Sequence, residues 1–142
     1  MGNERRPARG GWVIAGFYLA LIHAASSASP GEMGLTIPAG LDKLAHLCEF
    51  GVLAVLFWRP LRETAVGRPE VRAAAVLFVF VAANGLIDEF HQSFVPGREP
   101  SLMDSAADML GGGLAIYWLL HREKGRTQYT GATPGRSTGN AQ

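Results

Sequence analysis

Ionisable side chains gather at the end of an otherwise apolar stretch of the sequence. Residues 73–87 carry no charge, and Asp88, Glu89, His91 and Gln92 follow within five positions. Adjacent carboxylates and an imidazole are groups that can act as general acid and base, and an amide can hold a carboxylate in place. Each charge costs about 2.5 to 3.5 kcal/mol at the centre of a bilayer. If this apolar stretch lies in a membrane, several ionisable side chains at its end require a reason, and function is one.

A second apolar stretch, residues 41–58, carries its ionisable residues in its first half only. These are Asp42, Lys43, His46 and Glu49. At about 100° per residue of an α-helix, Asp42, His46 and Glu49 share one face. Proton transfer, metal ligation and internal hydrogen bonding are all open to an imidazole beside two carboxylates. Asp42 is also a good helix cap, which is the structural alternative for this residue.

A third polar face is expected in residues 102–120, where Asp104 and Asp108 lie one helical turn apart. Gly111 and Ala115 continue the same face, and small residues there allow a neighbouring helix to approach closely. Since the second and fourth segments begin where the third ends, all three faces lie at the same membrane depth, and we expect them to point at one another. Together they would form one polar pocket.

The adjacent residues Asp88 and Glu89 cannot both point in the same direction from a helix. Asp88 and Gln92 share a helical face with Asn84, whereas Glu89 lies to its side. We expect one of the two adjacent carboxylates to face the pocket and the other to meet water or Arg98. The guanidinium of Arg98 suits a carboxylate or phosphate ligand. Pairing with Asp104 or Glu99 to fix the loop is the alternative.

These considerations give three sets of candidate residues. The catalytic candidates are Asp42, His46, Asp88 and Glu89. The ligand-binding candidates are Lys43, Glu49, Gln92, Arg98, Asp104 and Asp108. A divalent cation is a further candidate cofactor, because hard cations prefer oxygen ligands. Its candidate ligands are Asp88, Asp104 and Asp108.

Four apolar segments must position these residues. Each is about long enough to cross a hydrocarbon core. The segments span residues 12–28, 41–58, 71–87 and 102–120. The connectors between them contain the Pro and Gly typical of turns. The sequence therefore predicts an all-α fold, a transmembrane bundle of four helices.

The ends of the chain differ in composition from this apolar part. Residues 1–10 and 123–142 contain few large aliphatic side chains, so we expect a flexible basic arm and a disordered tail. The membrane domain is predicted to span residues 11–122. Its single cysteine, Cys48, lies among apolar neighbours, which favours a packed thiol.

The distribution of charge predicts the orientation in the membrane. Eleven of the 13 Lys and Arg residues lie in the two ends of the chain and in the connector between the second and third segments. Cytoplasmic loops collect basic residues, so both termini are predicted to be cytoplasmic. Eight of the 12 Asp and Glu residues then lie on the outer side or in the outer half of the segments. The predicted pocket is acidic and opens outward.

The same residues resemble a known pattern. "DKLAHLCEFGVLA" at 42–54 and "LIDEFHQSFVPGREPSLMDSAADMLGG" at 86–112 are similar to the VanZ-like family of small bacterial multi-pass membrane proteins. Its motifs are matched by Asp42, Lys43, His46, Asp88, Glu89, Gln92, Pro96, Gly97, Arg98 and Asp104. The family usually has Asn where this chain has Asp108. The resemblance implies four spans in the bacterial inner membrane and a function in the cell envelope.

Two functions are compatible with this resemblance. The family is named for a member associated with resistance to the glycopeptide antibiotic teicoplanin, which favours binding of a lipid-linked or glycopeptide ligand. The alternative is an intramembrane enzyme that uses acid/base groups or a divalent metal on a lipid phosphate. The lipid bilayer is the expected partner. The scattered basic residues predict no nucleic-acid binding.

The first segment has an alternative interpretation. Arginines, an apolar run and then small residues also resemble a secretory signal with a cleavage site. Cleavage would leave the other three segments in the same orientation. We favour retention, because the resemblance includes a first span, and intact-mass measurement on the purified protein distinguishes the two.

Overall fold

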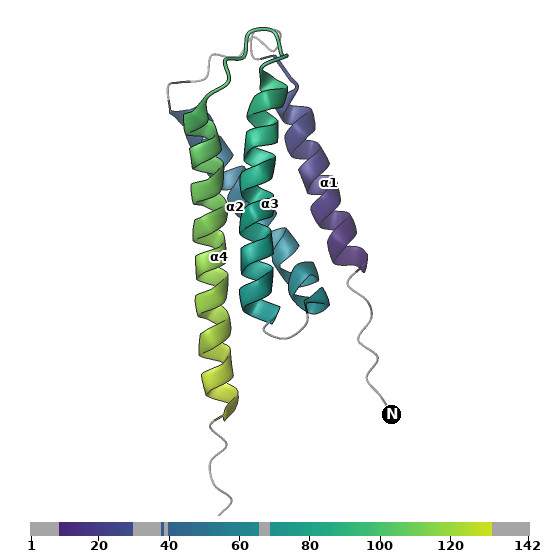
Figure 1. The fold of residues 1–142 in the computed structure, drawn as a ribbon, viewed down its shortest axis with the longest axis vertical. Helices are drawn as coiled ribbons and strands as arrows, with labels where there is room; N and C mark the ends of the chain where they lie inside the picture. The colour runs from purple at the N-terminus through teal and green to yellow at the C-terminus, as the bar shows by residue number, and fades with distance from the viewer. Residues whose placement is uncertain (1–8, 30–37, 39, 66–68, 132–142) are drawn as a thin grey trace, which may run out of the picture.

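The structure is a bundle of four α-helices. The computed structural model describes residues 9–29, 38, 40–65 and 69–131. The helices are α1 (Arg9–Ser26), α2 (Leu41–Thr64), α3 (Pro69–Gln92) and α4 (Leu102–Gly131) (Figure 1). Within these ranges there is no β-strand. The prediction of an all-α, four-helix fold is therefore confirmed.

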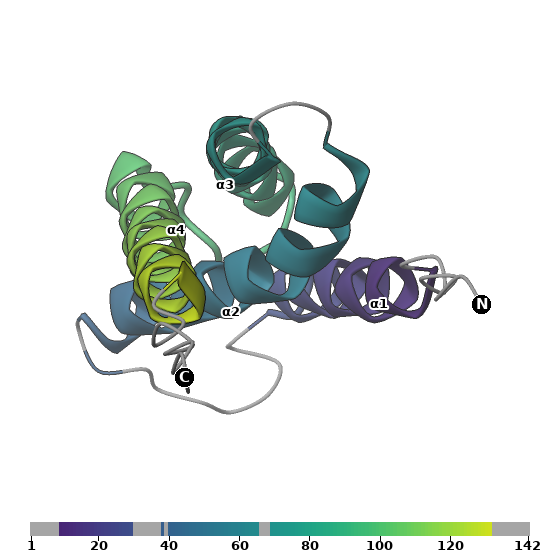
Figure 2. The same cartoon turned by 90° about the horizontal axis from the view of Figure 1, so that it is seen from below.

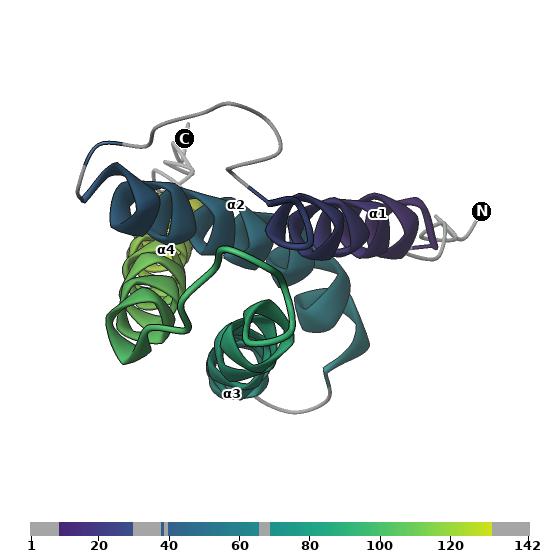
Figure 3. The ribbon, with the colours of Figure 1, turned by 90° about the horizontal axis from the view of Figure 1, so that it is seen from above.

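Helix α2 organises the bundle. It contacts each of the other three helices, and α3 also packs against α4. Helix α1 contacts α2 and α3 but not α4. Seen from below, α1 and α4 lie toward opposite ends of the inclined α2, with α3 on one side of it (Figure 2). The view from above shows the same order (Figure 3).

The two ends of the bundle differ in chemistry. The start of α1, the end of α2, the start of α3 and the end of α4 lie toward the bottom of Figure 1. At the top lie the other four helix ends and the loop of residues 93–101. This upper end carries the predicted site residues, and it is called the polar end below.

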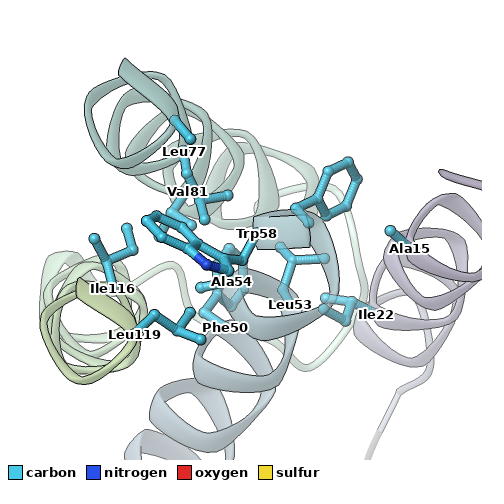
Figure 4. Close-up of a cluster of buried hydrophobic side chains, with 12 residues drawn as sticks. Ala15, Ile22, Phe50, Leu53, Ala54, Trp58, Leu77, Val81, Ile116 and Leu119 are labelled. Carbon is cyan, nitrogen blue, oxygen red and sulfur yellow. The ribbon is translucent and has the colours of Figure 1, made fainter. Parts of the chain in front are cut away.

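An apolar core fills the bundle below the polar end. Figure 4 shows buried side chains from all four helices, with Trp58 of α2 facing Val81 and Ile116 and with Ile22 of α1 beside Leu53. The buried cluster consists of Ala15, Ile22, Phe50, Leu53, Ala54, Phe57, Trp58, Ala73, Leu77, Val81, Ile116 and Leu119. The ring of Phe57 also stacks near Trp12 and Phe80, with centroids 5.8 and 4.7 Å away. This core fixes the helices that carry the site.

Close packing of α4 depends on adjacent glycines. A Cβ atom on Gly111 would overlap the backbone of Leu47 in α2. One on Gly112 would lie 2.6 Å from Cγ1 of Val81 in α3. A Cβ on Gly113 would make only an ordinary contact, 3.7 Å from the ring of Phe78. The close approach predicted from the small residue at position 111 is thus present.

Length and composition identify two of the four helices as able to cross a membrane. These are α2 and the part of α3 from Glu70 to Gln92. The other two helices are not among them: α1 is 18 residues long and begins with Arg9, and α4 has Asp104 and Asp108 in its first two turns. A bundle with four spans stays a prediction.

Two local predictions differ from the structure. Residues 123–131, predicted as part of the disordered tail, continue α4, and Glu123 pairs with Arg62 of α2 at this end. Cys48 is exposed rather than packed, because it lies on the outer face of α2. The rest of the predicted tail, 132–142, and residues 1–8 of the predicted arm lie outside the described residues.

Candidate functional site

The polar end encloses a pocket between α1, α2, α3 and the loop after α3. Its volume is about 180 Å³. The lining residues are Ala25, Ser26, Asp42, Ala45, His46, Glu49, Asp88, Gln92 and Arg98. Six of the ten predicted site residues are therefore in one cavity. The face of α2 that carries Asp42, His46 and Glu49 follows directly from their helical spacing.

Asp88 is the most enclosed group of the pocket wall, with 1% of its surface exposed. Gln92, one turn later in α3, donates a hydrogen bond of 2.8 Å from Nε2 to Oδ2 of Asp88. On the other side, Nδ1 of His23 in α1 lies 3.3 Å from Oδ1 of Asp88. The amide of Gln92 thus holds this carboxylate by a hydrogen bond, whereas His23 lies within ion-pair distance of an oxygen that accepts no hydrogen bond in the described structure. Helical spacing within one segment does not indicate this contact of His23, although an ionisable residue in an apolar segment is a usable signal.

His46 and Asp108 form a buried pair between α2 and α4. Nδ1 of His46 lies 3.0 Å from Oδ1 of Asp108, which is 0% exposed. The other carboxylate oxygen, Oδ2, has no hydrogen-bond partner among the described residues. Gly85 of α3 makes room for it, since a Cβ there would lie 2.9 Å from Oδ2. The pair leaves Nε2 of His46 free for other contacts.

Lys43 connects two carboxylates at the edge of the polar end. Its Nζ donates to Oδ1 of Asp104, at 2.9 Å, and to Oδ2 of Asp42, at 3.0 Å. Asp42 also accepts a hydrogen bond of 3.0 Å from the backbone N of Gly40, which precedes α2. Asp42 therefore stabilises the start of the helix as well as lining the pocket. Asp104 pairs with Lys43 rather than with Arg98.

Glu89 differs from the expectation that it would meet water or Arg98. Only 6% of its surface is exposed, and Oε2 accepts a hydrogen bond of 2.5 Å from the backbone N of Ser101. Ser101 precedes α4, and its carbonyl accepts from the backbone N of Asp104. The loop of residues 93–101 thus folds back over Glu89. The second oxygen, Oε1, is buried without a hydrogen-bond partner in the described structure.

The loop after α3 is fastened to the end of α1. Nε and Nη2 of Arg98 both point to the carbonyl of Ala28, at 3.4 Å, and Oγ of Ser29 donates to the carbonyl of Pro96 at 2.9 Å. Gly97 has a φ of 79°, a conformation that glycine adopts without strain. Arg98 consequently lies at the pocket wall.

The grouping with metal-ligand spacing differs from the predicted one. Ligand atoms of His46, Glu89 and Asp104 lie within 4.8 Å of one another, and all three residues are buried. Of the predicted ligands, Asp104 belongs to this group, whereas Asp88 lines the pocket and Asp108 pairs with His46. Helical spacing alone could not place Glu89 in the group, because the loop brings it to α4.

The fold and the site together define an all-α protein with span-length apolar helices and a buried ionisable cluster at one end. The family model described as VanZ/LLP1 matches residues 9–121. The chain belongs to this VanZ-like family, as its motifs predicted. No curated protein and no solved structure matches the chain. Family membership and the two apolar helices indicate a membrane protein of the cell envelope.

Proposed function

We propose that all four helices span the bacterial inner membrane, with the polar end outside and both termini in the cytoplasm. Large apolar side chains are exposed on every helix, which water would disfavour and lipid would accommodate. Examples are Val13, Ile14, Phe17, Val52, Val55, Val76, Val79, Leu114, Tyr117 and Trp118. The start of α1 and the end of α4 lie at the same end of the bundle, as an even number of spans requires (Figure 1).

The pocket at the outer surface is proposed to bind the headgroup of a lipid-linked or glycopeptide ligand. The observation that carries this proposal is that the wall of the 180 Å³ cavity contains both carboxylates and a guanidinium. Asp42, Glu49 and Asp88 accept hydrogen bonds from hydroxyl, amide and ammonium groups. Arg98 suits a phosphate. A lipid diphosphate that carries sugars or a peptide offers both kinds of partner.

The size of the pocket restricts which part of such a ligand it holds. Pockets that enclose drug-sized ligands measure about 300 to 1,000 Å³, and this one is smaller at about 180 Å³. We expect one sugar or the diphosphate to enter it while the rest of the headgroup stays outside. The lipid chain would then lie along the exposed apolar surface of the helices.

Replacing Glu49 by Gln tests the binding proposal. The protein is placed in lipid nanodiscs and titrated calorimetrically with a polyprenyl diphosphate-linked disaccharide–peptide, with teicoplanin, and with phosphatidylglycerol. Wild type should bind one of the first two saturably and phosphatidylglycerol weakly. Since a hydrogen bond to a charged group contributes about 1.5 to 3 kcal/mol, Glu49→Gln should weaken binding about tenfold or more.

Glu99→Gln is the matched control, because Glu99 is exposed on the same end of the molecule and does not line the pocket. It should bind as wild type does. Binding that is equal in Glu49→Gln and Glu99→Gln, or that never saturates in wild type, would contradict the proposal.

The His46–Asp108 pair favours a second candidate function. A carboxylate that holds an imidazole through Nδ1 is the arrangement of a general base, and here the two atoms are 3.0 Å apart. The enzyme would hydrolyse or transfer a lipid phosphate. Hydrolysis of the probe's diphosphate bond would release polyprenyl phosphate and the disaccharide–peptide 1-phosphate. Release of these products by wild type, abolished in His46→Gln, would favour this function over binding alone.

A further inference from the structure

We infer that His46, Glu89 and Asp104 form a site for a divalent transition-metal ion beside the pocket, with which it shares His46. The three side chains come from α2, α3 and α4, and their ligand atoms lie within 4.8 Å of one another. Bonds from Zn²⁺ to nitrogen or oxygen measure about 2.0 to 2.2 Å. Small side-chain rotations therefore suffice to bring one atom of each residue onto a shared ion.

An unpartnered buried oxygen supports the site independently of this spacing. Oε1 of Glu89 has no hydrogen-bond partner among the described residues, although 94% of the residue's surface is buried. Its other oxygen is fixed by the backbone N of Ser101. A buried carboxylate oxygen without a partner is costly. A metal ion among the three residues would satisfy it.

The partner of His46 also suits metal binding. Histidines that bind metals commonly donate their second ring N–H to a carboxylate, which fixes the ring and the tautomer. Nδ1 of His46 lies 3.0 Å from Oδ1 of Asp108, and this leaves Nε2 as the ligand atom. Asp108 would then orient His46 without touching the ion.

The charge of the polar end is also suited to a cation. The predicted site residues include six carboxylates, and the fixed positive charges among them are Lys43 and Arg98. Four of the carboxylates are at least nine-tenths buried: Asp88, Glu89, Asp104 and Asp108. Buried charges require paired partners or metal ions. A divalent ion between Glu89 and Asp104 would offset part of this excess.

The ligand types identify the class of ion. Imidazole nitrogen suits zinc and its neighbours among the first-row metals, whereas Mg²⁺ and Ca²⁺ prefer all-oxygen sites. One nitrogen and two carboxylates therefore favour Zn²⁺ or Mn²⁺. Lys43 competes with the ion, because its Nζ lies 2.9 Å from Oδ1 of Asp104. It can keep its contact with Asp42 when the ion is bound.

Equilibrium dialysis of the full chain tests the site. Untagged protein in detergent is stripped with a chelator, dialysed against Zn²⁺, and analysed for metal by mass spectrometry. We expect one equivalent in wild type and at least tenfold weaker binding in Glu89→Gln and Asp104→Asn. Lys43→Gln should bind Zn²⁺ severalfold more tightly, because a competing cation is removed. Mg²⁺ at the same concentration should not displace Zn²⁺.

Glu49→Gln separates this inference from the proposed binding function. Glu49 lines the pocket but lies outside the metal grouping, so this variant should keep its zinc and lose ligand affinity. Should Glu89→Gln and Asp104→Asn fold poorly, Cu²⁺ bound to the wild-type protein still reports the site. Its electron paramagnetic resonance spectrum must show coupling to one histidine nitrogen. Absence of saturable zinc in wild type, or equal zinc affinity in Glu89→Gln and wild type, would overturn the inference.

Discussion

Gly111→Ala should destabilise the protein more than any other exchange of glycine for alanine in α4. The new Cβ would overlap the backbone of Leu47, and a backbone cannot move aside without shifting the whole of α2. Overpacking costs typically about 1 to 3 kcal/mol, and we expect the upper end of this range. Since α2 and α4 carry the His46–Asp108 pair, their separation should also disrupt the polar end.

Gly113→Ala is the matched control for this prediction. It lies two residues further along the same helix, and its Cβ would sit 3.7 Å from the ring of Phe78. Both exchanges improve intrinsic helix propensity by the same amount, about 1 kcal/mol. The difference in unfolding free energy, measured by SDS titration in mixed micelles, therefore reports the contact alone. Equal stability of the two variants would mean that α2 and α4 are not packed as closely as described.

His46→Leu should cost about 3 to 5 kcal/mol of stability, the range found when one partner of a buried ion pair is removed. Asp108 is 0% exposed, and the variant would leave its carboxylate without the imidazole. The double variant His46→Leu/Asp108→Leu should recover most of this loss, because two apolar side chains of suitable size replace the pair. A double-mutant cycle on the same unfolding assay gives the coupling.

Control substitutions at the other end of the molecule keep this cycle interpretable. Arg59 and Glu63 lie one turn apart on the exposed surface of α2 and form an ion pair with an Nε–Oε1 distance of 2.8 Å. Exposed pairs contribute about 0 to 1 kcal/mol, so Glu63→Gln should have little effect. Strictly additive effects at His46 and Asp108 would show that the two side chains do not interact.

Sequence periodicity was sufficient to predict the helices and the polar face of α2. Apolar runs set the four helices, and the spacing of Asp42, His46 and Glu49 put them on one face, which lines the pocket. The amide of Gln92 was expected to hold a carboxylate in place, and it donates a hydrogen bond to Asp88 one turn earlier in α3. These features depend on contacts within one helix, and helical geometry alone determines them.

The remaining features depend on contacts between elements distant in sequence. His23 lies near Asp88 because α1 packs beside α3, and sequence periodicity does not predict which helices pack together. Glu89 is buried because the loop of residues 93–101 returns over it to begin α4. The same return places Glu89 near His46 and Asp104. The path of this loop is set by several weak contacts, here from Arg98 to the carbonyl of Ala28 and from Ser29 to the carbonyl of Pro96. Such contacts between distant segments cannot be predicted from sequence periodicity.

Thiol labelling at the pocket tests most directly whether the polar end faces outward. In a Cys48→Ser background, Ala45→Cys places a single thiol in the pocket wall, and Glu63→Cys places one at the opposite end. A small, charged, membrane-impermeant methanethiosulfonate reagent is applied to spheroplasts. The expected result is modification of Ala45→Cys in intact spheroplasts and of Glu63→Cys only after permeabilisation. The reverse order of labelling would contradict an outward-facing pocket.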